Sequence, residues 1–152
     1  MVQLLRLLAA SRFNNPFMIS TEIALRTQFY DLDPMNIVWH GNYVRFLEQA
    51  RSALLSEIGY GYAEMQASGF SWPIVDLTIR YVRPLRLSQD FVVRATLTEY
   101  ENRICVVYRL FDSVSREVLT KARTVQLAVS LATGELSFES PPQLIACVRS
   151  RL

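Results

Sequence analysis

The longest helical pattern in the chain begins directly after Asn42. Apolar side chains recur there at steps of four, three, four and four residues, at Tyr43, Leu47, Ala50, Leu54 and Ile58. This spacing places them on one stripe of an α-helix, which further apolar residues widen. Asn42 can cap the start of the helix, and Gly59 can close its end in the left-handed conformation. Because most of its girth is apolar, we expect other structure to surround this helix.

A hydrophobic period of two residues, typical of β-strands, dominates most of the remaining chain. It predicts one strand before the helix and four after it, over residues 21–30, 75–81, 91–98, 104–111 and 119–131. In the last run, small residues such as Thr120, Ala122 and Thr124 alternate with larger ones and would let a helix approach closely.

The links between these strands are short and rich in turn residues, which indicates antiparallel pairing. One long apolar helix and a meander of strands pack most economically when the sheet curls around the helix. We therefore predict an α+β fold in a single domain over residues 1–152. An N-terminal extension covers about 1–19, and a C-terminal tail covers about 135–152.

Composition narrows the classes of function. Of the 152 residues, 51% are hydrophobic and 20% are charged, and the net charge is +2, so neither disorder nor nucleic-acid binding is indicated. One histidine and two distant cysteines argue against a metal site. No stretch reaches the roughly 18 consecutive apolar residues that a membrane span needs. Residues 1–10 look like a short signal-peptide core, but Arg6 interrupts them, so we expect a cytoplasmic protein.

The polar break between the first strand and the long helix is the place where chemistry is most plausible. It contains two carboxylates, Asp31 and Asp33, and the single histidine, His40. The first N–H groups of a helix lack partners inside it and can hold a developing oxyanion, while a nearby carboxylate attacks a carbonyl or activates water. This combination suits acyl transfer. Asp-Pro turns and carboxylates before helices are also common, so the residue types alone leave a purely structural role open.

The run from Asp33 to Tyr43, DPMNIVWHGNY, continues as VRFLEQAR to Arg51. It resembles the signature of the hotdog-fold thioesterases of the 4-hydroxybenzoyl-CoA thioesterase class, and Tol-Pal-associated acyl-CoA thioesterases are similar to it as well. The resemblance implies a hotdog fold, an antiparallel sheet wrapped around a central helix. It also implies a hydrolase of acyl-CoA or acyl-carrier-protein thioesters that needs no metal or bound cofactor. A homodimer or homotetramer, with sheets paired edge to edge and active sites at the dimer interface, is implied too.

Individual roles follow by position in this signature. Asp33 matches the catalytic aspartate, which acts as nucleophile or as general base, whereas Asp31 has no such match and is read as a turn-bonding or solvated residue. His40 is a second catalytic candidate, more through its backbone N–H than through its side chain. Many relatives have glycine at the position of Asn36, and asparagine tolerates the positive φ that glycine would allow. The candidate substrate-binding residues are Trp39, Gly41, Tyr43 and Trp72.

Other residues compete for these roles. Glu48 is a rival carboxylate, since another hotdog branch carries its catalytic acid on the central helix, but Arg45 and Arg51 flank it at helical spacing and favour an ion pair. Three arginines follow one strand and its exit, Arg80, Arg83 and Arg86. They could bind coenzyme A phosphates or an acidic carrier protein, or they are simply solvated.

Two alternative functions stay open on the same fold. A hydratase or dehydratase of acyl thioesters needs an Asp/His pair. In the hydratase motif, however, the histidine is closer in sequence to the aspartate than His40 is to Asp33. A non-catalytic acyl-thioester-binding protein would bind the same ligand without turning it over.

Overall fold

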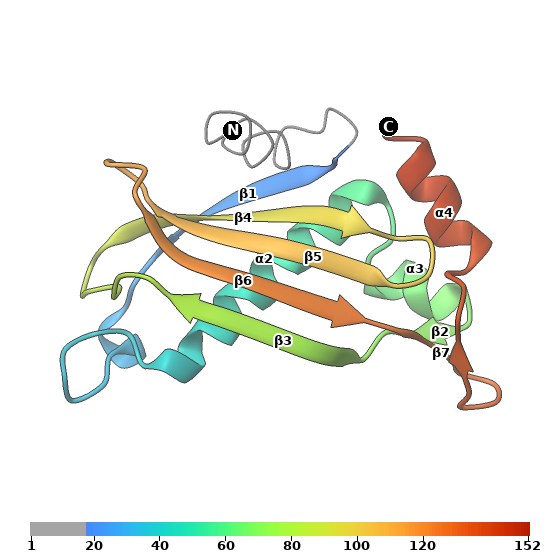
Figure 1. Ribbon diagram of the computed structural model, residues 1–152, viewed down its shortest axis with the longest axis horizontal. Coiled ribbons are helices and arrows are strands. Elements are labelled where there is room, and N and C mark those ends of the chain that lie inside the picture. Colours follow the sequence, from blue (N-terminus) through green and yellow to red (C-terminus); the bar gives the residue numbers. More distant parts are fainter. Residues whose placement is uncertain (1–17) are drawn as a thin grey trace, which may run out of the picture.

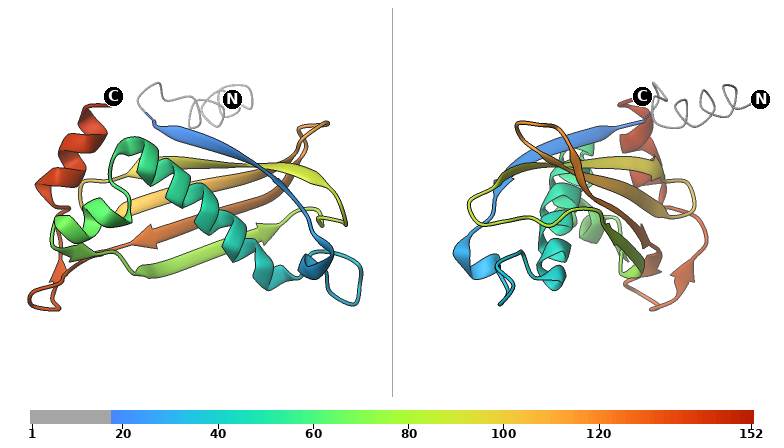
Figure 2. Two further views of the ribbon diagram at one scale, coloured as in Figure 1. Left: turned by 180° about the vertical axis from the view of Figure 1, so that it is seen from behind. Right: turned by 60° about the vertical axis from the view of Figure 1, so that its left-hand side comes forward.

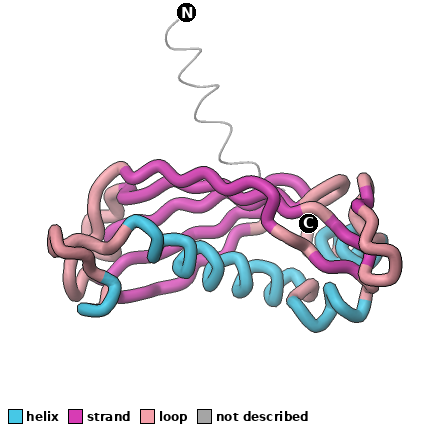
Figure 3. Tube along the Cα trace, turned by 90° about the horizontal axis from the view of Figure 1, so that it is seen from below, coloured by secondary structure: helices cyan, strands magenta, loops and turns pink. Residues whose placement is uncertain are grey.

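The computed structural model describes residues 18–152 and contains one five-stranded antiparallel sheet wrapped around a long helix. Figure 1 shows the sheet, and Figure 3 shows the helix α2 (Tyr43–Ile58) lying along one face of it. In spatial order the strands are β1 (Ser20–Arg26), β4 (Asp90–Glu99), β5 (Ile104–Asp112), β6 (Val118–Gln126) and β3 (Ile74–Tyr81). This arrangement confirms the predicted α+β architecture.

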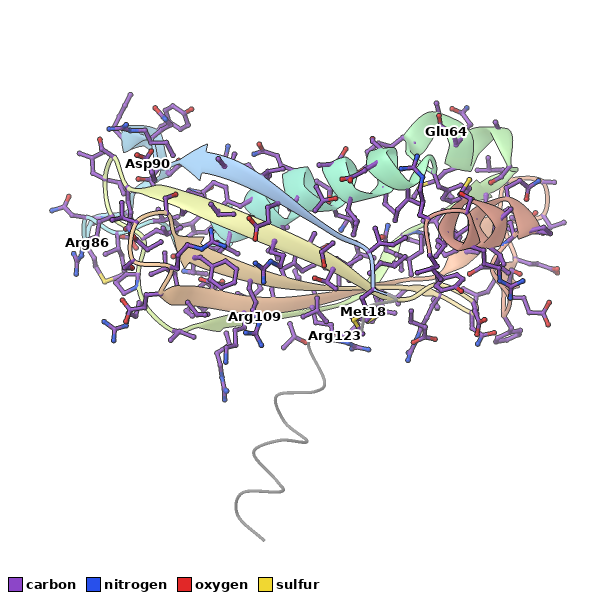
Figure 4. The ribbon with its side chains drawn as sticks, turned by 90° about the horizontal axis from the view of Figure 1, so that it is seen from above. Met18, Glu64, Arg86, Asp90, Arg109 and Arg123 are labelled. Atoms are coloured by element: carbon purple, nitrogen blue, oxygen red, sulfur yellow. The ribbon has the colours of Figure 1, made fainter. Side chains whose placement is uncertain are left out.

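The core lies between α2 and the concave face of the sheet. On β4 the alternate residues Phe91, Val93 and Ala95 have no exposed surface. On β6 the small residues Thr120, Ala122 and Thr124 are buried, as the alternation predicts for a strand under a helix. Figure 4 shows Arg109 and Arg123 projecting from the opposite face of the sheet.

The two ends of α2 are built differently. Gly59 ends the helix at φ 91°, and its N–H donates to the carbonyls of Leu55 and Ser56, which confirms the predicted left-handed closure. Asn42 is the N-cap residue of α2, as predicted, but its side chain makes no capping hydrogen bond. Its side-chain amide donates to the Asp31 carbonyl at 2.8 Å instead of capping the helix. The helix is preceded by the 3-10 turn η2 (His40–Asn42).

A smaller sheet closes the far end of the molecule (Figures 1 and 2). It contains β2 (Phe70–Ser71), β7 (Ala128–Ser130) and β8 (Leu136–Ser137), and lies beside α3 (Tyr62–Ala67). The C-terminal tail forms α4 (Pro142–Arg149), whose Leu144 and Val148 are buried.

Two strand predictions need correction. The first strand ends at Arg26 rather than at residue 30, because the Gln28 N–H bonds to the Asp31 carboxylate and the chain turns into the 3-10 helix η1 (Phe29–Asp31). The predicted strand over 119–131 is split into β6 and β7. At the break, the Leu127 N–H bonds to the carbonyl of Pro73, which lies between β2 and β3 and has no N–H to return a second hydrogen bond.

The predicted extension and the apolar run at 1–10 fall almost wholly outside the described residues. Between residues 18 and 152, none of the helices combines the length and the apolar character needed to cross a membrane.

Candidate active site

The segment that follows η1 forms a small hairpin whose tip carries Asp33. Leu32 and Val38 form an antiparallel bridge, and the Asp33 N–H donates to the Ile37 carbonyl at 2.8 Å. The Asn36 N–H closes the turn by donating to the Asp33 carbonyl at 3.0 Å. Asn36 has φ 60°, so asparagine adopts the left-handed conformation expected at this position.

The Asp33 carboxylate is oriented by its own turn. Its Oδ1 accepts a hydrogen bond of 2.8 Å from the Met35 N–H, and the residue is half-buried. Within residues 18–152 no hydrogen bond to Oδ2 is found, so one carboxylate oxygen is fixed and the other is available to a ligand or to water.

The turn before α2 is tied to the chain ahead of the hairpin. The Trp39 N–H and the Asn42 side-chain amide both donate to the Asp31 carbonyl, at 2.9 and 2.8 Å. The N–H groups of His40 and Gly41 open the helical turn and have no acceptor inside it, and none is found elsewhere in the described part of the chain. These two amides can therefore bind an anionic oxygen.

The side chain of Trp39 explains why glycine follows His40. A Cβ placed on Gly41 would overlap the six-membered ring of the Trp39 indole. The Trp39 and His40 rings lie beside each other with centroids 5.1 Å apart, and both residues are exposed. The indole therefore packs against Gly41 in the first part of the turn.

Asp31 and Asp33 have different surroundings. Asp31 is buried, and its Oδ2 accepts the Gln28 N–H at 2.8 Å in a capping box of η1. Its Oδ1 is ion-paired with the Arg45 guanidinium. The expected turn-bonding role is confirmed, and the expectation that Asp31 is solvated is wrong because α2 supplies a cation that permits its burial.

Two predicted substrate-binding residues lie inside the single chain's core. Tyr43 is buried, and its hydroxyl accepts the Leu85 N–H at 3.3 Å. Burial raises the pKa of this phenol above 10.0. Trp72 donates its indole N–H to the Tyr60 hydroxyl at 3.2 Å, just beyond the C-terminal end of α2. The structure therefore gathers Asp33, Trp39, His40 and Gly41 at one end of the helix and leaves Trp72 at the other.

Glu48 lies outside this group. Its carboxylate is ion-paired with Arg51 and also accepts a hydrogen bond from the Tyr62 hydroxyl. It lines a groove of about 640 Å³ between β1 and α2, together with Ile23 and Leu25. The predicted ion pair with Arg51 is confirmed, whereas Arg45 pairs with Asp31 instead.

The three candidate phosphate-binding arginines are exposed. Arg83 is ion-paired with Glu117 at 2.9 Å. Arg86 forms a β-bridge with Ile37 of the hairpin, and Figure 4 shows it at the same end of the molecule as Asp90. Of the three, Arg86 is thus attached directly to the hairpin that carries Asp33.

One contact at the site was missed by sequence reasoning. The Tyr81 hydroxyl, on β3, donates to the His40 carbonyl at 2.7 Å across a separation of 41 residues. Nothing local marks Tyr81, because its alternation with polar neighbours is the same as that of any strand residue. Only the sheet topology brings it to the start of α2.

Metal-binding geometry is not found at this end of the molecule or elsewhere between residues 18 and 152: no three His, Cys, Asp or Glu side chains are grouped to hold an ion.

Comparison with known proteins adds independent evidence. A model of the Thioesterase-like superfamily matches residues 27–146. The chain is 33% identical over 106 residues to "Putative acyl-CoA thioesterase YneP" of Bacillus subtilis, covering 69% of this chain and 76% of that protein. It is 30% identical over 122 residues to "Putative esterase sll0410" of Synechocystis, covering 80% and 74%. Its structure superposes on DHNA-CoA thioesterase from Staphylococcus aureus with a TM-score of 0.70, at 24% identity and coverage of 77% and 78%.

Fold and relatives together define an enzyme of the thioester hydrolase class. The chain belongs to the Thioesterase-like superfamily. The resemblance seen in the sequence and the hotdog fold that it implies are thereby confirmed.

Proposed function

We propose that the protein hydrolyses acyl-CoA thioesters to a free acid and a thiol at the end of α2 that carries Asp33. One observation supports this proposal most strongly. The 32–38 hairpin holds a carboxylate, Asp33, with one oxygen free of hydrogen bonds, and the adjoining turn holds two backbone amides that have no acceptor among the described residues. The relatives' names support the substrate class at the level of the family.

The proposed chemistry uses the backbone and one carboxylate. The N–H groups of His40 and Gly41 bind the thioester oxygen and stabilise the negative charge it gains during attack. Asp33 either takes a proton from water, which adds to the carbonyl carbon, or attacks that carbon itself to form a mixed anhydride that water then hydrolyses. In both routes the C–S bond breaks and the sulfur leaves as a thiolate that takes up a proton. No metal or bound cofactor takes part in this reaction.

We further propose that the active enzyme is a homodimer, or a tetramer of such dimers, joined through β3. This strand is at the edge of the sheet and exposes apolar side chains to solvent in the single chain, at Ile74, Val75, Leu77 and Tyr81. An exposed apolar edge favours pairing with a second strand. The hairpin contacts the segment just after β3, where the Val38 N–H donates to the Leu85 carbonyl at 2.9 Å. The proposed site therefore lies beside the proposed interface, where Trp39 and Arg86 are exposed to substrate.

The direct test is thiol release from a panel of acyl-CoA thioesters with short, long and aromatic acyl groups. We expect turnover by the wild type and a loss on the order of 10²- to 10⁴-fold in kcat for Asp33→Asn, which keeps the shape of the side chain but removes its basicity. The products separate the reaction classes, because a hydrolase yields free acid whereas a hydratase leaves an intact thioester. A wild type that binds these thioesters without releasing thiol, from coenzyme A and acyl-carrier-protein forms alike, would contradict the proposal.

A further inference from the structure

A side chain of the edge strand is bonded to the turn that opens the central helix. The Tyr81 hydroxyl donates a hydrogen bond of 2.7 Å to the His40 carbonyl, and Figures 1 and 2 show the end of β3 beside the start of α2. The Tyr81 ring meets the Tyr43 ring edge to face, with centroids 5.0 Å apart. Tyr43 is itself held in the core by the Leu85 amide. The direction of the Tyr81 hydroxyl is thus set by a packed ring.

The His40 carbonyl and the Gly41 N–H belong to one peptide group. When a carbonyl accepts a hydrogen bond, its amide becomes more polarised, and the N–H of that amide becomes a stronger donor. The neighbouring peptide group has the same arrangement through the backbone, since the Trp39 carbonyl accepts the Asn42 N–H at 2.9 Å. Among the described residues, Tyr81 is the only side chain that bonds to either of these two peptide groups.

We propose that Tyr81 is a positioning residue of the thioesterase, which orients and polarises the His40–Gly41 peptide so that the Gly41 N–H binds the oxyanion. This inference rests on the proposed function, because it takes that N–H as an oxyanion donor. Tyr81 touches no reacting atom and acts only through the amide. Since the oxygen carries more charge in the transition state than in the bound thioester, the effect falls on kcat rather than on KM.

The hydroxyl is a suitable permanent donor. Partial burial raises the pKa of Tyr81 above the ordinary 10.0 of a phenol, so it keeps its proton throughout the neutral range. A donor that does not titrate in this range supports the oxyanion equally throughout it.

The test compares Tyr81→Phe with Tyr62→Phe. Tyr81→Phe keeps the ring packed against Tyr43 and removes only the hydroxyl. Tyr62→Phe removes a hydroxyl that donates a hydrogen bond to Glu48 on α2, away from the 32–38 hairpin. We expect Tyr81→Phe to lower kcat about tenfold, a fraction of the roughly 10²- to 10³-fold effect of deleting a whole oxyanion donor, with KM unchanged. Tyr62→Phe should leave both constants unchanged.

A spectroscopic readout tests the same contact without turnover. In nitrogen-15 and carbon-13 labelled protein, Tyr81→Phe should move the Gly41 amide proton and the His40 carbonyl carbon resonances upfield, and Tyr62→Phe should not. The inference is overturned if these resonances stay in place. It is also overturned if kcat is unchanged while Asp33→Asn is inactive, or if kcat falls equally in both tyrosine variants. A wild type without turnover would overturn the proposed function instead.

Discussion

At the scale of single residues, the proposed oxyanion-binding turn depends on the close contact between Gly41 and the Trp39 indole. Gly41→Ala adds a methyl group where the ring already lies, so the ring or the turn must move. We expect kcat/KM for thiol release to fall about tenfold, since small displacements of oxyanion donors are costly. In the double variant Gly41→Ala with Trp39→Leu, part of the loss should be recovered, because the obstructing ring is gone. Losses that simply add in a double-mutant cycle would contradict a direct contact.

The two aspartates show what residue-level reasoning from the sequence can reach. Asn36 has the positive φ that the signature implies, and Asp33 bonds within the same turn, because a tight turn is dictated by neighbours in sequence. The burial of Asp31 could not be predicted, since it depends on Arg45, which the helix delivers from 14 residues away. Tyr81 was missed for the same reason over a longer separation.

At the scale of elements, the hairpin between β5 and β6 is held by a carboxylate. The pKa of Asp112 is lowered from 3.8 to about 2, because the carboxylate accepts hydrogen bonds from the Ser115 N–H, the Gln89 side chain and the Val114 N–H. A carboxyl whose pKa is lower in the folded chain stabilises the fold above its unfolded pKa. This contribution is lost as the pH falls from 3.8 to about 2.

We therefore predict that Asp112→Asn lowers the free energy of unfolding at pH 6 and that the difference from the wild type disappears near pH 2. Urea unfolding at a series of pH values, followed by circular dichroism, measures this difference. A deficit that stays constant down to pH 2 would assign the effect to the shape of the side chain rather than to its charge.

Elements were predicted well where one physical signal governs them. The apolar stripe of α2 and its end at Gly59 follow from local sequence. The end of β1 and the break between β6 and β7 do not. The Gln28 N–H bonds to the Asp31 carboxylate instead of a strand, and Pro73, which stands opposite Leu127, has no N–H to donate. Asn42 stands at the N-cap, as its residue type predicts, yet the Asp31 carbonyl rather than the helix binds its side chain.

At the scale of the whole molecule, the apolar edge of β3 predicts association. Leu77 is 40% exposed in the single chain, so Leu77→Glu would place a charge in the proposed interface at little cost to the isolated subunit. We expect the wild type to sediment as a multiple of the 17.5 kDa chain and Leu77→Glu to shift toward the monomer, with reduced thiol release because the site lies beside β3. Val114→Glu, at a position 92% exposed in the hairpin between β5 and β6 rather than on β3, is the matched control. A monomeric wild type would refute this assembly.

The central claim is that Asp33, rather than the helix-borne Glu48, is the catalytic carboxylate. The most direct measurement is the steady-state rate of thiol release from the best acyl-CoA substrate by Asp33→Asn and by Glu48→Gln, side by side at one pH. The geometry predicts that Asp33→Asn loses nearly all turnover, while Glu48→Gln, which disturbs only the ion pair with Arg51 and the bond from Tyr62, stays close to the wild type. The reverse result, an active Asp33→Asn and an inactive Glu48→Gln, would contradict the account and move the catalytic site to the groove between β1 and α2.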